Sequence, residues 1–67
     1  MNAIKALGYI KDTLGTDRKC AAYLGYTEGY INSFLCARKE IPEKAAALII
    51  FKAEQLKKEM ERDKANG

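Results

Sequence analysis

The sequence predicts a small all-α protein, a compact bundle of four helices that forms one domain over residues 1–67. Apolar residues recur at helical spacing in four segments, and each segment is bounded by residues that start or stop helices. The chain has 67 residues, 48% of them hydrophobic, which is enough for one small core and no second domain. We expect helices at about residues 2–14, 17–24, 28–36 and 42–63.

The first helix follows from its cap and its apolar face. Asn2 can accept from the free N–H groups of the first turn. The predicted core face carries Ala3, Ile4, Leu7, Ile10 and Leu14. Gly8 lies inside this helix at a cost of about 1 kcal/mol relative to Ala, which indicates either a close helix crossing or a tolerated glycine. Gly15 closes the helix.

Two short helices joined by a tight turn follow, a pattern typical of a helix-turn-helix. Thr16 is a cap for the first of them, Gly25 can take the left-handed conformation that ends it, and Thr27 caps the second. Ala21 is small enough to let the two helices approach at a steep angle. The second helix places Ile31, Phe34 and Leu35 on its core side. Its other side carries Glu28, Gly29, Asn32 and Ser33.

The last helix begins near Pro42, whose fixed φ suits a first turn. Its main apolar stripe is Ala45, Leu48, Ile49, Ala53, Leu56 and Met60. Ala47, Ile50 and Phe51 form a second apolar patch elsewhere on the same helix. This patch predicts a homodimer interface, unless the first helix wraps far enough to cover Ile50 and Phe51.

Residues 4–50 resemble the Cro and lambdoid-repressor helix-turn-helix family. Ala21, Gly25, Ile31 and Phe34 stand at the spacings of that family, and ARKEIP is similar to the loop that follows its motif. The segment LGTDRKCAAYLGYTEGYINSF looks most like the small phage Cro and CII-type regulators. The resemblance implies a lambda-repressor-like DNA-binding fold. It also implies a sequence-specific transcriptional regulator, a phage or prophage repressor that binds an operator through the major groove.

The position of each residue in that motif implies its role at DNA. Glu28, Gly29, Asn32 and Ser33 would face the groove: Asn32 could pair with adenine, Glu28 could accept from cytosine N4, and Ser33 could serve several bases. The alternative for Glu28 is a first-turn carboxylate favoured by the helix dipole, and for Asn32 and Ser33 a solvated face. Tyr26 and Tyr30 are better explained by packing than by base contacts. The candidates for phosphate contacts are Arg18, Lys19, Thr27, Arg38 and Lys39, although the basic pairs could equally be solvated surface.

Composition narrows the function classes. The net charge of +3 permits nucleic-acid binding without requiring it. The chain has no His and no CxxC motif, so we expect no catalytic residue, no metal site, no cofactor and no small-molecule substrate. Cys20 and Cys36 are expected to be free thiols. No apolar run reaches membrane-spanning length and no signal-peptide cleavage pattern is present, so we expect no membrane partner and a place in the cytoplasm of a bacterial host.

A second function class fits the same sequence. The apolar patch of the last helix could be the functional surface of a protein-binding module, such as an antirepressor or an antitoxin. Glu28 and Gly29 favour this alternative, because they offer little chemistry for reading bases.

Overall fold

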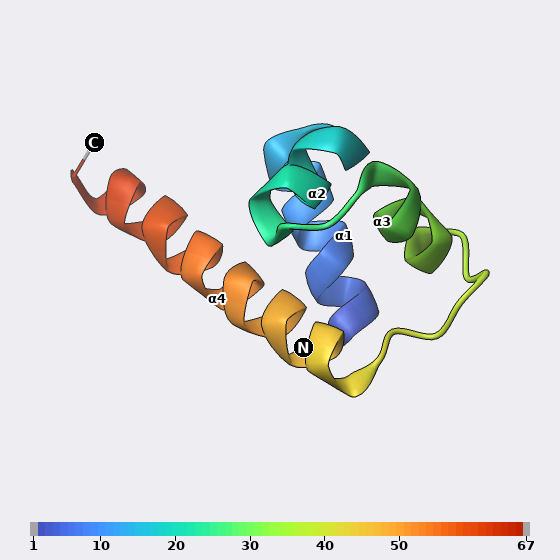
Figure 1. Ribbon diagram of the computed structural model, residues 1–67. Helices are drawn as coiled ribbons and strands as arrows, with labels where there is room; N and C mark the ends of the chain where they lie inside the picture. The colour runs from blue at the N-terminus through green and yellow to red at the C-terminus, as the bar shows by residue number, and fades with distance from the viewer. Residues whose placement is uncertain (1, 67) are drawn as a thin grey trace.

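The computed structural model describes residues 2–66, with side chains described as far as residue 62. Helices and the turns between them make up this part of the chain, so the predicted all-α class is confirmed. The helices are α1 (Ala3–Leu14), α2 (Asp17–Leu24), α3 (Glu28–Leu35) and α4 (Glu43–Asn66) (Figure 1). The helix α2 has the expected bounds. The helix α1 begins one residue later than expected and α3 ends one residue earlier, while α4 begins one residue later and continues to Asn66. Within the described residues, no helix combines the length and apolar character needed to span a membrane.

Side chains cap the first three helices at their N-termini, as the sequence predicts. Asn2, Thr16 and Thr27 each accept a hydrogen bond from the backbone N–H three residues further on, at 2.8, 3.1 and 3.2 Å. Each cap satisfies one of the N–H groups that have no partner inside the helix. The bounds of these helices therefore follow from local backbone chemistry.

Left-handed residues end the same helices. Gly15 (φ 100°) closes α1 and Gly25 (φ 84°) closes α2. After α3 the left-handed residue is Ala37, at φ 58°. Its N–H donates to the Phe34 carbonyl at 3.1 Å and the Arg38 N–H donates to the Ser33 carbonyl at 2.8 Å, which are the two bonds of a Schellman motif. Alanine is strained here by about 1 kcal/mol or more, because its Cβ crowds the following carbonyl oxygen.

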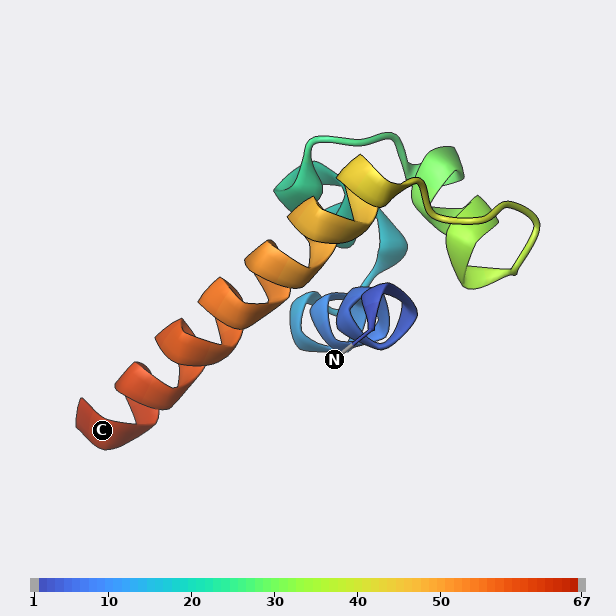
Figure 2. The same cartoon turned by 90° about the horizontal axis from the view of Figure 1, so that it is seen from below.

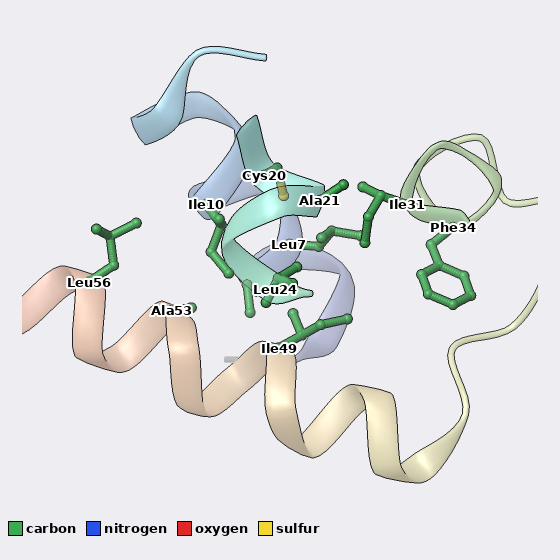
Figure 3. Close-up of a cluster of buried hydrophobic side chains, with 11 residues drawn as sticks. Leu7, Ile10, Cys20, Ala21, Leu24, Ile31, Phe34, Ile49, Ala53 and Leu56 are labelled. Carbon is green, nitrogen blue, oxygen red and sulfur yellow. The ribbon is translucent and has the colours of Figure 1, made fainter. Parts of the chain in front are cut away.

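The core lies where α1 meets the other three helices (Figure 3). Leu7 and Ile10 of α1 are fully buried, and α4 contributes Ile49 and Ala53, which are also fully buried. The whole cluster consists of Ala6, Leu7, Ile10, Cys20, Ala21, Leu24, Ile31, Phe34, Ile49, Ala53 and Leu56.

One expectation for α1 is wrong, and the two alternatives for Gly8 are resolved in favour of a tolerated glycine. The sequence pattern puts Ile4 on the core face, but half of its surface is exposed, while Ala6 is fully buried in its place. The core face is therefore rotated about the helix axis relative to the one drawn from the sequence. No close crossing occurs at Gly8, because a Cβ added there meets no other atom within 4 Å.

The helix α4 extends past the body of the molecule (Figure 2). Its buried stripe is Ala45, Ile49, Ala53 and Leu56, whereas Met60, expected on the same stripe, is 43% exposed. From residue 57 to residue 62 every side chain is exposed. Met60 is uncovered because the other helices end before they reach it.

The second patch of α4 is only partly covered. Ile50 packs at the edge of the core and is half-buried. Phe51 is 55% exposed and Ala47 is exposed on the same side of the helix. A large aromatic side chain is thus left in contact with water.

Candidate nucleic-acid interface

The helices α2 and α3 are joined by the short turn of residues 25–27. The N–H groups of Gly25 and Tyr26 both donate to the Ala21 carbonyl, each at 2.9 Å, so the turn folds back on the end of α2. Ala21 is 2% exposed and belongs to the buried cluster. A side chain larger than a methyl group would find no room there, as the sequence predicts.

A row of aromatic rings fixes α3 against this turn. Tyr26 and Tyr30 pack edge to face with their centroids 5.1 Å apart, and Tyr30 and Phe34 pack in the same way at 4.6 Å. Such contacts contribute about 0.5–1.5 kcal/mol each beyond area burial. Both tyrosines are half-buried against the core, which favours packing as their role.

The exposed end of α3 is its N-terminus. Thr27, Glu28 and Gly29 are all exposed. The Thr27 hydroxyl oxygen accepts from the Tyr30 N–H at 3.2 Å, and its own O–H remains available as a donor. Glu28 is favoured in the first turn by the helix dipole. Gly29 has no side chain, so a ligand can approach the backbone closely at this point.

The next turn of the same face is more enclosed. Asn32 and Ser33 are half-buried, and both are already hydrogen-bonded within the protein. The Asn32 Nδ2 donates to Asp17 Oδ2 at 3.4 Å, while its Oδ1 accepts from the Cys36 thiol at 3.7 Å. The Ser33 hydroxyl donates to the Tyr30 carbonyl at 2.6 Å. Any base contact by Asn32 or Ser33 therefore requires exchange of these bonds.

Asp17 connects three helices. Besides its contact with Asn32 in α3, its Oδ1 lies 3.6 Å from Lys11 Nζ in α1. This Oδ1 is buried and accepts no hydrogen bond, so the ammonium group of Lys11 is its compensating partner. The result is that the start of α2 is held beside the middle of α3.

Two exposed basic pairs lie close to α3 along the chain, one at the start of α2 and one directly after α3. Arg18 and Lys19 directly follow Asp17 and so lie at the start of α2. Arg38 and Lys39 follow the end of α3, where both of their N–H groups donate to the Ser33 carbonyl, at 2.8 and 3.3 Å. The structure thus ties one pair to the flank of α3 through Asp17 and the other to its C-terminal end.

The two cysteines are free thiols, as expected, and differ in environment. Cys20 is buried in the core, where desolvation raises the pKa of its thiol. The nearby Asp17 carboxylate also raises this pKa and Lys11 lowers it. Cys36 is exposed one turn after Asn32, on the outer side of α3. Among the described side chains, no three His, Cys, Asp or Glu residues come together as a metal site requires.

Sequence reasoning missed two members of this surface. Asp17 stands out in the sequence only as part of the first turn of α2, and nothing nearby in the chain reveals a contact with a residue 15 positions later. The contact of the Cys36 thiol with Asn32 could have been predicted, because Cys36 stands four residues after Asn32 and so lies on the same side of the helix.

Comparisons of the chain with protein-family models, with curated proteins and with solved structures each found no match.

Proposed function

We propose that the protein is a sequence-specific DNA-binding transcriptional regulator, a Cro-like repressor that places α3 in the major groove of an operator. The observation that carries this proposal is the combination found at α3. Its inner side is fixed to the core by aromatic packing, its N-terminal turn is exposed, and exposed basic pairs lie at the start of α2 and directly after α3. Recognition helices dock in this way, with N-terminal residues at base edges.

The proposed contacts divide between phosphates and bases. Arg18, Lys19, Arg38 and Lys39 bind phosphates by their charge, and Thr27 does so through its free O–H. Glu28 accepts from cytosine N4, while Gly29 allows the backbone to come close to the base edges. Asn32 and Ser33 contact bases only after their internal hydrogen bonds break, so they contribute less to binding than Glu28.

The proposal includes a homodimer formed through Ala47, Ile50 and Phe51. A single α3 contacts only a few base pairs, and a second copy places another α3 about one helical turn away along the duplex. The exposed Phe51 supports this interface. Full burial of such a side chain contributes roughly 1.5–3 kcal/mol, and about half of that remains to be gained because Phe51 is 55% exposed. The site of action would be the DNA of a bacterial host cell.

Selection of binding sites from random duplexes tests the function directly. A consensus should emerge, and fluorescence anisotropy should show binding to it about 10³-fold or more tighter than to a shuffled duplex. Glu28→Ala should alter the selected sequence at one position in each half-site. Asp12→Ala is the matched control, since Asp12 is an exposed carboxylate of α1, and it should leave the consensus unchanged. Failure to enrich any sequence would refute the proposal.

A second candidate function has its own supporting observation. The internal bonds of Asn32 and Ser33 weaken the reading face, while Phe51 and Ala47 remain uncovered on α4. A protein-interaction module, such as an antirepressor or antitoxin, would use this α4 surface instead. It predicts that the selection enriches nothing although the protein is folded, so the same experiment separates the two functions.

A further inference from the structure

A pocket of about 460 Å³ opens between the first turn of α1, the loop that follows α3, and the start of α4. Figure 1 shows the loop that follows α3 running to the start of α4. The apolar part of the wall consists of Ala3, Ile4, Phe34, Ala37, Ile41 and Ala46. The pocket is on the scale of small-molecule sites, which are typically 300–1,000 Å³.

Two of these wall residues are informative. The side chain of Ile4 is half exposed because it lies outside the core, and it lines the pocket. Phe34 points from α3 toward the space between the loop and α4 (Figure 3). Phe34 itself is 1% exposed, so it lies beneath the floor of the pocket, and the side chains of Ile4 and Ile41 provide the apolar surface that a ligand body can reach.

The charged part of the wall is the segment Arg38, Lys39 and Glu40, which sums to one positive charge. Within the described side chains, the ion pair of the structure is Lys11–Asp17, so Arg38 and Lys39 are not neutralised by a salt bridge. The first turns of α1 and α4 also border the pocket, and helix N-termini add partial positive charge. The potential at the mouth thus favours an anion.

We propose that this pocket binds a small amphipathic anion, namely a monocarboxylate with an aromatic or branched apolar body. The body packs against Ile4 and Ile41 above the buried Phe34 ring, and the carboxylate pairs with Arg38 or Lys39 at the mouth. A second consequence rests on the proposed DNA-binding function: because the same two cations are candidates for phosphate contacts, the bound carboxylate competes with the DNA backbone and lowers affinity for DNA.

Titration of the full chain with 2-naphthoate, followed by amide resonances in two-dimensional NMR, tests the site. Saturable shifts should concentrate at the start of α1, in residues 37–41 and at Ala46. The neutral 2-naphthamide has the same body, and it should bind about two- to fivefold more weakly, the range of one exposed ion pair. Equal binding of the two compounds would refute the anionic preference. Shifts centred on Phe51, or no saturable shifts with 2-naphthoate, would refute the pocket.

Variants separate the two parts of the wall. The double change Arg38→Gln and Lys39→Gln should reduce 2-naphthoate binding to the level of 2-naphthamide and leave the amide unaffected. Glu40→Gln should tighten 2-naphthoate binding, because it removes the opposing charge. The control pair Lys57→Gln and Lys58→Gln, exposed on the far part of α4, should change neither. If the control pair weakens binding as much as the Arg38 and Lys39 pair, the site is elsewhere.

The link to DNA needs its own measurement. With the selected duplex, saturating 2-naphthoate should weaken binding by at least the two- to fivefold expected when one ion pair is removed, while 2-naphthamide should have less effect. Unchanged DNA affinity in the presence of bound 2-naphthoate would refute the competition. A protein that binds no duplex even without ligand refutes the DNA-binding function instead, and the NMR titration then decides the pocket alone.

Discussion

The side-chain amide of Asn32 in α3 donates to the Asp17 carboxylate in α2 at 3.4 Å, so the outer face of α3 is held by the first residue of the preceding helix. The same carboxylate lies 3.6 Å from Lys11 in α1. One side chain thereby links three helices and limits the freedom of Asn32.

Replacing Asp17 by Ala should lower the free energy of unfolding by about 1 kcal/mol. The change removes a partly exposed ion pair, a long hydrogen bond and a favourable first-turn charge, each of modest value. Urea unfolding monitored by circular dichroism measures it. Asp12→Ala is the control, because Asp12 is exposed on α1, and it should change stability by less than about 0.5 kcal/mol. Equal effects of the two changes would mean that the three-helix contact contributes nothing.

Two glycines should respond in opposite directions to the same substitution. Gly8→Ala should stabilise the protein by up to about 1 kcal/mol, because a Cβ there meets no other atom within 4 Å and alanine favours helix. Gly25→Ala should destabilise it by about 1 kcal/mol, since φ is 84° at that position. Thermal unfolding of both variants gives the comparison. A destabilised Gly8→Ala variant would indicate a helix contact that the structure does not contain.

The two thiols should differ in reactivity. At pH 8, iodoacetamide should modify Cys36 quickly and Cys20 only after denaturation, because Cys20 is buried and its raised pKa leaves little thiolate. Mass spectrometry should therefore show one adduct on the folded protein and two in urea. The Cys36→Ser variant should show none while folded. Rapid double modification of folded protein would contradict the burial of Cys20.

Removing the second basic pair should weaken DNA binding without changing its specificity. With Arg38→Ala and Lys39→Ala, the dependence of log K on log salt should flatten by about one unit for each phosphate that the protein no longer binds. Affinity should fall by a similar factor on selected and shuffled duplexes. The double variant Lys57→Ala and Lys58→Ala is the control, because it removes the same two positive charges from another part of the protein. A wild-type slope in the Arg38 and Lys39 variant would show that these side chains do not touch the DNA backbone.

Phe51→Glu should separate the proposed dimer into folded monomers. Phe51 is 55% exposed, so the charge should leave helical circular dichroism largely intact while sedimentation shifts toward 7.5 kDa. Ile49→Glu is the contrasting change two residues earlier, and it should unfold the chain because Ile49 is fully buried. A wild-type protein that sediments as a monomer at high concentration would argue against the α4 interface.

The starts and ends of the helices were predictable because they depend on residues within a few positions along the chain. Asn2, Thr16 and Thr27 cap backbone groups three residues away, and Gly25 needs only its own conformational freedom. Ala37 shows the limit of such signals. The structure places it in the left-handed region without the glycine that usually marks that position.

Properties that depend on where neighbouring helices lie could not be predicted in the same way. Spacing alone put Ile4 in the core and overlooked Ala6, because it does not reveal which side of α1 the other helices approach. For the candidate site, spacing identified the exposed Glu28 and Gly29. It could not show that Asn32 is held by Asp17, since that contact depends on how α2 and α3 pack.

The extension of α4 beyond Leu56 divides the backbone hydrogen bonds of this helix into two populations. Those near Ile49 and Ala53 are shielded by the core, so we expect them to open only when the whole protein unfolds. Those of residues 57–62 belong to exposed turns, and short helical segments without tertiary contacts are marginal in water. Their amide hydrogens therefore exchange with solvent through local fraying. A fluorophore attached to this extension would report that fraying, whereas one beside the core would report the cooperative transition of the domain.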